Sequence, residues 1–350
     1  MRKLIDQISM QQSRIVDLEV KGLQRRMDKI QTPVAAVVIM ACNRADYLER
    51  TIKSILKYQN AVASKYPLFV SQDGSDPQVR EKALSYDQLT HMQHLDSKPV
   101  QTERPGELIA YYKIAHDMEI APDFFDYFEA AAALMEKDKT IMAVSSWNDN
   151  GQKQFVHDPE ILYRSDFFPG LGWMLTKSTW NELSPKWPKA YWDDWLRLQE
   201  NHKGRQFIRP EVCRTYNFGE HGSSLGQFFR QYLEPIKLND VQVDWKSKDL
   251  SYLMEDEYIK HFAEILKNAK PINGADAVLK ASNVQGDVRV HYKDQPDFER
   301  IARQFGVFQE WKDGVPRTAY KGVVVFRYPP PRRVFLVGPK SFELLGIKSV

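Results

Sequence analysis

The densest group of possible metal ligands in this chain is the run His116-Asp117-Met118-Glu119. Imidazole and carboxylate groups at such short spacing could hold a divalent cation. In open α/β sheets, a carboxylate that grips a metal nucleotide normally follows a buried apolar strand. The preceding residues, Tyr111 to Ala115, do not have the apolar pattern of such a strand. We therefore expect a metal ligand here without a strand that leads into it.

A second chemically competent run is Trp192-Asp193-Asp194-Trp195, in a stretch rich in aromatic residues that suggests a sugar platform. A carboxylate in a partly apolar cleft has a raised pKa and can serve as a general base. The alternative is that the two aspartates complement the start of a helix as capping residues. The residues alone leave both interpretations open.

Two polar loops offer groups that suit a nucleotide. Arg44 could clamp a diphosphate with its planar guanidinium group, although a surface arginine is an equal alternative. Asp73 could accept hydrogen bonds from ribose hydroxyls or from a uracil N–H group, because an ionised carboxylate only accepts. The alternative for Asp73 is a plain turn made with Gly74.

The apolar pattern predicts the elements that would position these loops. The run Val34 to Met40 is typical of a strand buried on both faces, and the stretch from Tyr47 to Leu56 has helical spacing. A second strand, Pro67 to Ser71, comes just before Asp73. This β-α-β order predicts a parallel sheet with the loops of Arg44 and Asp73 at the same edge.

The fold class that follows is α/β, with a Rossmann-like nucleotide-binding domain and a smaller C-terminal α+β domain. Residues 1–32 predict an amphipathic stem helix, either solvated or self-associating. Residues 33–219 form the predicted catalytic domain, and residues 220–255 a mobile loop and linker that contain Ser224. Residues 256–350 form the predicted C-terminal domain.

Composition excludes several classes of protein. The chain has 350 residues, 43% of them hydrophobic, and two cysteines, which rules out a disulfide scaffold or a multi-cysteine zinc site. The net charge of +3 arises within residues 1–32, so the body has no electrostatic footprint for nucleic acid. The longest apolar run is half the length of a membrane-spanning helix, and no signal-peptide core is seen.

Seven motifs taken together resemble the N-acetylglucosaminyltransferase I family, in its plant type. The resemblance runs from about residue 33 to residue 340, and the combination is highly specific. The motifs are Ala41–Leu48, Ser71–Gly74, Tyr111–Ala115, Ala121–Phe125, Ser146–Gly151, Asp166–Trp173 and Lys186–Trp195.

The resemblance implies an inverting GT-A glycosyltransferase of the Golgi, with Mn²⁺ as cofactor. Its donor would be UDP-GlcNAc, and its acceptor the α-1,3-linked mannose of a five-mannose N-glycan on glycoproteins. By residue-to-residue match, Arg44, Asp73 and Ser224 would contact the nucleotide sugar. Asp117 would bind the metal and Asp193 would be the base, a division of tasks that suits inversion.

The chain also departs from that family. Family members carry about two dozen further residues, including a buried strand, between the counterparts of Ala115 and Asp117, and His116 stands where they have a donor-contacting aspartate. Their membrane anchor is also missing, so Golgi attachment would need an anchor from elsewhere. Cys42 lacks the partner cysteine of animal relatives because Gly74 stands there, which predicts a free thiol.

We expect the catalytic domain to be incomplete near residues 115–117, with sheet edges exposed and activity reduced or absent. The alternative function is a non-catalytic variant that binds a glycan or a partner and has lost metal-nucleotide binding. A further alternative is an aggregation-prone chain with no cooperative unfolding transition.

Overall fold

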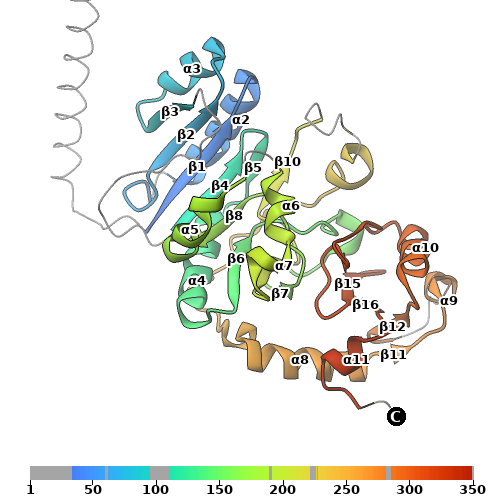
Figure 1. The fold of residues 1–350 in the computed structure, drawn as a ribbon. Coiled ribbons are helices and arrows are strands. Elements are labelled where there is room, and N and C mark those ends of the chain that lie inside the picture. Colours follow the sequence, from blue (N-terminus) through green and yellow to red (C-terminus); the bar gives the residue numbers. More distant parts are fainter. Residues whose placement is uncertain are drawn as a thin grey trace, which may run out of the picture.

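The computed structural model describes residues 34–59, 62–94, 110–188, 191–220, 226, 228–280 and 285–348. The predicted stem helix of residues 1–32 and Ser224 lie outside these ranges. The described residues build one large and one smaller sheet, with a long helix beneath both (Figure 1).

The large sheet has eight strands in the order β3-β2-β1-β4-β8-β6-β9-β7. Neighbouring pairs β1–β2, β1–β4, β2–β3 and β6–β9 are parallel, whereas β8 and β7 pair antiparallel to their neighbours. The sheet is therefore mixed, and the prediction of a parallel sheet holds only for its first half and for one later pair. Its strands are β1 (Ala35–Ala41), β2 (Leu68–Asp73), β3 (Leu89–His94), β4 (Ala110–Ala115), β6 (Ile141–Ser145), β7 (Leu162–Ser165), β8 (Trp173–Thr176) and β9 (Gln206–Pro210).

The prediction that no strand leads into His116 was wrong. Strand β4 ends at Ala115, and it pairs with β1 on one side and with β8 on the other. The expectation of exposed edges at this point is wrong for the same reason, since β4 is internal to the sheet. The apolar pattern of Tyr111 to Ala115 is interrupted by Lys113, but aromatic and β-branched residues favour a strand when both neighbours supply backbone partners.

Helices cover both faces of the large sheet. Met174 of β8 packs with α4 on one face, whereas its neighbours Trp173 and Leu175 pack with α5 and α6 on the other. This alternation is the period of two expected of a strand buried on both sides. The helices of this unit are α2 (Ala45–Gln59), α3 (Pro77–Leu84), α4 (Phe124–Lys137), α5 (Lys177–Leu183), α6 (Trp192–Arg197) and α7 (Gln199–His202), with short 3₁₀ turns at Lys153–Phe155 and Ser184–Lys186.

The smaller sheet has the order β11-β12-β16-β15. Strand β15 is buried on both faces: Val323 and Val325 share a core with α8, and Val324 and Phe326 share a second core with α10. The elements of this unit are α8 (Glu255–Asn268), β11 (Lys270–Pro271), α9 (Ala275–Lys280), β12 (Val288–His291), α10 (Gln295–Phe305), β13 (Trp311–Lys312), β14 (Val315–Pro316), β15 (Val323–Arg327), β16 (Arg333–Val337) and α11 (Ser341–Leu344).

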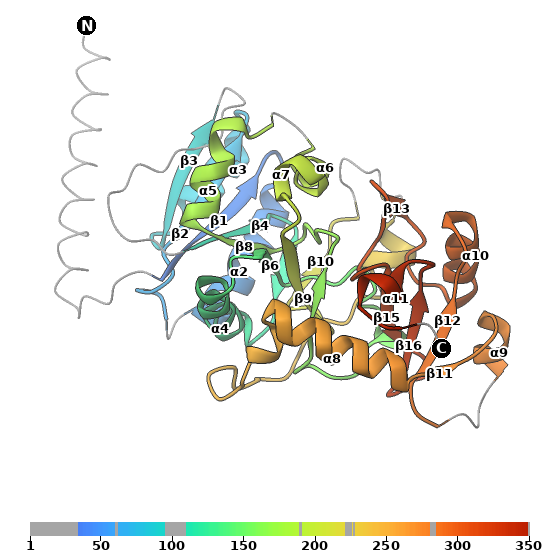
Figure 2. The same cartoon turned by 60° about the horizontal axis from the view of Figure 1, so that its bottom comes forward.

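Helix α8 joins the two units, because its buried residues Phe262 and Leu266 belong to the same apolar core as β1 and β15. Figure 2 shows this helix running below both sheets. Between the units the chain forms β10 (Thr215–Asn217), a π-helical turn at Phe229–Leu233 and a 3₁₀ turn at Ser251–Leu253. Strand β10 pairs antiparallel with β5 (Met118–Ile120).

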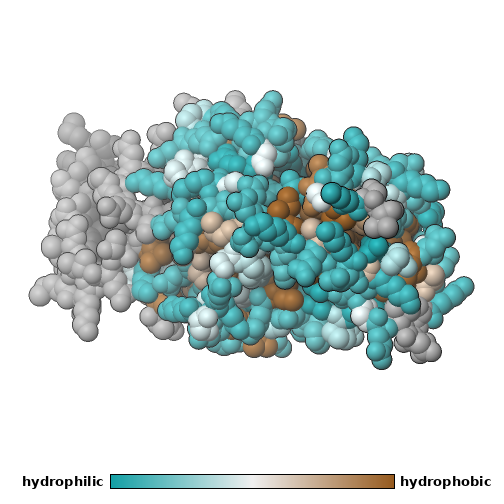
Figure 3. All heavy atoms as spheres, turned by 90° about the horizontal axis from the view of Figure 1, so that it is seen from below, coloured by the Kyte–Doolittle hydropathy of each residue, from teal (hydrophilic) through white to brown (hydrophobic). Residues whose placement is uncertain are grey.

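The surface gives no sign of a membrane-spanning segment in the part of the chain that the structure describes. No helix there combines the length and apolar character needed to cross a bilayer. The face shown in Figure 3 is mostly hydrophilic, with only scattered apolar spots among the coloured residues.

Candidate active site

Three of the predicted site residues lie at one edge of the large sheet. Strands β1, β2 and β4 are parallel neighbours, so the residues that follow their carboxyl ends meet there. Arg44 follows β1, Asp73 ends β2 and Asp117 follows β4. The prediction that the loops of Arg44 and Asp73 share an edge is therefore confirmed.

Arg44 and Asp117 are in direct contact, since Nη2 of the arginine lies 3.3 Å from Oδ2 of the aspartate. The guanidinium group also lies over the ring of Tyr47, at 4.5 Å from its centroid. Asp73 is exposed at the end of β2. This edge of the sheet thus combines the guanidinium group of Arg44, the largely buried carboxylate of Asp117 and the exposed carboxylate of Asp73.

His116 and Asp117 each present an unsatisfied buried atom. The backbone N–H of His116 donates to the carbonyl oxygen of Met40 at 3.0 Å, and Nδ1 lies 3.0 Å from the same oxygen. A proton on Nδ1 leaves Nε2 as an acceptor, and Nε2 has no partner among the described residues. Burial lowers the pKa of His116, as does the charge of Arg44, against the opposing effect of Asp117. Oδ1 of Asp117 is also buried, and no described residue is its hydrogen-bond partner.

The position of Asp117 is fixed from the neighbouring ribbon β5–β10. The backbone N–H of Phe218 donates to the carbonyl oxygen of Asp117 at 3.0 Å, and Met118 pairs with Asn217. On the other side, Thr51 and Ser54 of α2 accept hydrogen bonds from the backbone of β5. These hydroxyl groups carried no signal in the sequence, because they are far from Asp117 along the chain.

Gly219 makes the close approach to Asp117 possible. A Cβ atom at this position would lie 2.3 Å from Oδ2 of Asp117, far inside van der Waals contact. Any side chain at position 219 would therefore displace the carboxylate. Its place in the Gly219-Glu220-His221-Gly222 run was the only sign available from the sequence.

The candidate metal site has one protein carboxylate in the described residues. No cluster of three or more His, Cys, Asp or Glu side chains that could enclose a metal is found among them. The unpartnered Oδ1 of Asp117 nevertheless suits a cation that takes its other ligands from phosphate oxygens and water. The residues present fit a metal bound together with a diphosphate, rather than one in an all-protein cage.

Asp193 lies on a different element, in the first turn of α6. Its carboxylate is 40% exposed, and its Oδ2 lies 3.1 Å from Nη1 of Arg197. Tyr191 is the N-cap residue of α6, and its side chain makes no capping hydrogen bond. Both Asp193 and Asp194 lie in the first turn of α6, where their charges complement the start of the helix as the alternative interpretation expected, but neither is the capping residue.

The tryptophans around Asp193 are half-buried and pack against an apolar core. Trp187 and Trp192 stack with ring centroids 6.2 Å apart, and Trp173 is buried beneath them. Leu196 of α6 belongs to the same apolar cluster. This packing gives α6 a rigid support on the sheet.

A short loop connects the neighbourhood of Asp193 with that of Asp117. The position of a Cβ atom on Gly170 is 3.4 Å from Cβ of Asp193, and the hydroxyl group of Thr215 donates to the carbonyl oxygen of Leu171 at 3.1 Å. Thr215 begins β10, which leads to the Phe218 contact with Asp117. The loop Gly170–Leu171 therefore lies close to Asp193 on one side and is hydrogen-bonded to β10 on the other.

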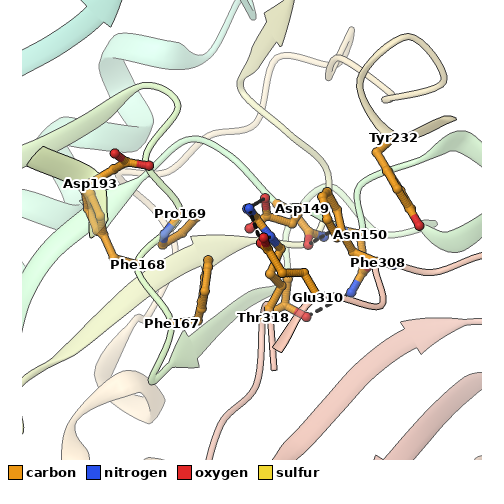
Figure 4. Close-up of polar contacts among 12 residues, drawn as sticks. Asp149, Asn150, Phe167, Phe168, Pro169, Asp193, Tyr232, Phe308, Glu310 and Thr318 are labelled. Atoms are coloured by element: carbon orange, nitrogen blue, oxygen red, sulfur yellow. Dashed lines mark hydrogen bonds and ion pairs between the residues drawn. The ribbon is translucent and has the colours of Figure 1, made fainter. Parts of the chain in front are cut away.

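The C-terminal unit closes in beside Asp193. Figure 4 shows Asp193 next to Phe168 and Pro169, with Asp149 and Asn150 meeting the loop of the C-terminal unit. Oδ1 of Asn150 accepts from the backbone N–H of Phe308 at 2.8 Å, and Arg317 pairs with Asp149 at 2.8 Å. Sequence reasoning missed these contacts, which join residues far apart in the chain.

These features define a class of protein. An α/β sheet with nucleotide-suited loops at the carboxyl ends of β1, β2 and β4 is the arrangement of a nucleotide-binding α/β protein. The model of the GNT-I family matches residues 1–118 and 115–349, so the match begins earlier than the resemblance from residue 33 predicted. The chain belongs to the GNT-I family.

A curated relative is the alpha-1,3-mannosyl-glycoprotein 2-beta-N-acetylglucosaminyltransferase of Arabidopsis thaliana. It is 67% identical over 393 positions, which cover 100% of this chain and 88% of the relative. The 393 positions exceed the 350 residues of the chain by 43, so the alignment leaves gaps in this chain. The two segments of the family match meet at residues 115–118, at the departure that the sequence predicted.

Two solved structures with low overall similarity each contain a bound nucleotide sugar. One is the mannosyltransferase PcManGT from Pyrobaculum calidifontis in complex with GDP-Man and Mn²⁺, with 16% identity, a TM-score of 0.41 and 75% of each chain covered. The other is S. aureus TarS in complex with UDP-GlcNAc, with 14% identity, a TM-score of 0.38 and 67% of each chain covered.

Proposed function

We propose that this chain transfers GlcNAc from UDP-GlcNAc to the α-1,3-linked mannose of a five-mannose N-glycan in the Golgi, with inversion. Membership of the GNT-I family and the name of the Arabidopsis relative support the donor and the acceptor. The observation that carries the proposal is the Arg44–Asp117 pair at the carboxyl edge of the sheet, with Oδ1 of Asp117 buried and unpartnered.

In this proposal Arg44 and Asp73 bind the donor. The guanidinium group of Arg44 neutralises diphosphate oxygens, and the exposed carboxylate of Asp73 accepts hydrogen bonds from the nucleoside. Asp117 would hold Mn²⁺, which when bound neutralises the charge that grows on the leaving diphosphate. Ser224, outside the described residues, is proposed to contact the donor from the loop after Gly219.

Asp193 is proposed as the general base. Its half-exposed carboxylate would take the proton from the attacking mannose hydroxyl, while the sugar–phosphate bond breaks on the opposite face. A single base on the acceptor side is what a one-step inversion needs. Nη1 of Arg197 lies 3.1 Å from Oδ2 of Asp193 and helps to hold the carboxylate in one orientation.

Calorimetry with UDP-GlcNAc, with and without Mn²⁺, tests the donor site, and release of UDP in the presence of a five-mannose glycan tests transfer. We expect metal-dependent binding that Asp117→Ala abolishes, and glycan-dependent release of UDP. As a matched control, Asp240→Ala on the exposed surface should leave both unchanged. Metal-independent binding, or binding that survives Asp117→Ala, would refute the assignment.

The second candidate is a non-catalytic variant that binds a glycan or a partner. It is favoured by the break of the family match at residues 115–118, beside the proposed metal ligand. This candidate predicts binding of a five-mannose glycan by the purified chain without any release of UDP. Calorimetry with the five-mannose glycan, together with the measurement of UDP release, therefore separates the two functions.

A further inference from the structure

Helix α6 receives an ion pair from the C-terminal unit that the proposed mechanism does not use. Nζ of Lys312, in the hairpin β13–β14, lies 2.6 Å from Oδ2 of Asp194. Asp194 is the residue next to the proposed base. The hairpin therefore contacts the first turn of the helix that carries Asp193.

The ion pair continues through Arg197 to the base. Nη1 of Arg197 lies 2.7 Å from Oδ1 of Asp194 and 3.1 Å from Oδ2 of Asp193. Its Nε and Nη2 both donate to the carbonyl oxygen of Phe168 at 3.2 Å, and only 7% of the side chain is exposed. Lys312, Asp194, Arg197 and Asp193 thus form a chain of alternating charges, which we call the Lys312–Asp193 chain.

Other charged groups near α6 are engaged elsewhere. Glu310 pairs with Arg317, and Lys186 lies over the ring of Trp195 and donates to Asn201. Asp313 is exposed in the turn of the hairpin. The loop from Phe167 to Gly170, which packs against Asp193, has no charged side chain.

Asp194 is ionised in this arrangement. Burial alone would raise the pKa of Asp194, but the hydrogen bond from Lys312 and the charge of Arg197 outweigh it and lower the pKa. Among the described residues, removal of Lys312 would leave Arg197 as the one cation that pairs with both carboxylates. Removal of the Asp194 charge would leave Asp193 as the one carboxylate of this pair with which Arg197 interacts.

We propose that Lys312 is a positioning residue for the general base, which acts through Asp194 and Arg197 to set the orientation and the electrostatic environment of Asp193. This inference rests on the proposed function, in which Asp193 accepts the proton of the acceptor hydroxyl. It makes the C-terminal unit a part of the catalytic machinery rather than only a support.

Lys312 and Asp194 should have opposite effects on Asp193, because their charges are opposite. Loss of the Lys312 cation destabilises ionised Asp193, so the acidic limb of the profile of kcat/KM against pH should move upward. Loss of the Asp194 anion should move the same limb downward. From Coulomb interactions through partly solvated protein, each shift is about half a pH unit.

The test compares Lys312→Met, Lys312→Arg, Asp194→Asn and the double variant in the full chain, with UDP-GlcNAc, Mn²⁺ and a five-mannose glycan. We expect Lys312→Met to lower kcat by about tenfold, with the KM for the donor unchanged, because the base and not the donor site is affected. Lys312→Arg keeps the positive charge, so its kcat and the position of its acidic limb should be close to those of the wild type. In the double variant Lys312→Met, Asp194→Asn the acidic limb should lie close to its wild-type position.

The control is Lys260→Met, on the exposed face of α8, which should leave kcat and the acidic limb unchanged. A melting curve for each variant confirms that it is folded. The inference alone is overturned if the wild-type protein is active but the acidic limb of its pH profile does not shift in opposite directions in Lys312→Met and Asp194→Asn. A folded wild-type chain without turnover overturns the proposed function, and the inference falls with it.

Discussion

At the scale of the residue, the proposed chemistry depends on two carboxylates in different surroundings. Asp117 is buried with one oxygen beside Arg44 and the other unpartnered, whereas Asp193 is half exposed beside Arg197. The first suits a metal ion, because a buried unpartnered oxygen gains most from a cation. The second suits proton transfer, because it is accessible to an acceptor.

Replacement of the proposed base tests this division. Asp193→Asn should lower kcat by about 10²- to 10⁴-fold, the usual contribution of general base catalysis. Binding of UDP-GlcNAc, measured by calorimetry, should stay within error of the wild-type value because the donor site is at another element. A large loss of donor binding would instead place Asp193 in the donor site.

Gly219 gives a second test at this scale. A Cβ atom in Gly219→Ala would lie 2.3 Å from Oδ2 of Asp117, so the carboxylate must move and metal-dependent donor binding should weaken by about tenfold or more. Gly170→Ala is a matched change near Asp193, where the added atom meets its nearest neighbour at 3.4 Å. Donor binding should be preserved in that variant, and equal losses in both would contradict the interpretation.

At the scale of the element, Asp138 ties three elements together at the opposite end of the sheet from the site. It follows α4, its Oδ2 pairs with Arg164 of β7 at 2.9 Å, and the same atom accepts from the backbone N–H of Glu255 at the start of α8. Burial alone would raise the pKa of Asp138, but hydrogen bonds from Thr140 and the pairing with Arg164 outweigh it and lower the pKa.

This pairing predicts a pH dependence of stability. Because the pKa of Asp138 is lower in the folded than in the unfolded chain, its contribution is complete above the unfolded value of about 4 and is lost as the pH falls through the folded value. Asp138→Asn should lower the free energy of unfolding by about 3 kcal/mol at neutral pH, since Arg164 stays buried.

Urea unfolding at a series of pH values measures this effect. The difference between wild type and Asp138→Asn should shrink as the pH falls below about 4, where the carboxylate of the wild type becomes protonated. A difference that is independent of pH would show that the carboxylate does not contribute through its charge.

At the scale of the whole molecule, the two sheets share one apolar core. Phe262 of α8 packs against Tyr320 and Phe335 of the C-terminal unit, and the same core extends to β1. Phe262→Ala should lower the free energy of unfolding by about 3–5 kcal/mol. Both units should still unfold in one transition, with Lys260→Ala on the exposed face as the control. Separate transitions for the two units would contradict the shared core.

The junction at Ala115 is also a question for the whole molecule. With β4 paired on both sides, we expect the purified chain to give a cooperative unfolding transition. We further predict that its turnover is lower than that of a variant that carries the corresponding segment of the Arabidopsis relative after Ala115. Equal turnover of the two proteins would refute the prediction that the activity of this chain is reduced. A chain that aggregates without a transition would contradict the internal position of β4.

The sequence by itself determined the elements that lie on regular patterns. The apolar runs of β1 and β2 and the periodicity of α2 agree with the structure within a few residues, because burial on a strand or on one helix face leaves a local pattern. The order of β1, α2 and β2 also placed Arg44 and Asp73 at one edge, and the motifs identified the family.

Only the tertiary structure decided how the chain continues into His116 and what surrounds the two carboxylates. Strand β4 lacks a clear apolar pattern and is defined by its neighbours β1 and β8, which a local window cannot contain. The contacts of Asp117 with Arg44 and Gly219, and of Asp194 with Lys312, join residues separated by dozens of positions. Such contacts depend on how sheets and hairpins pack, and packing is a property of the whole chain.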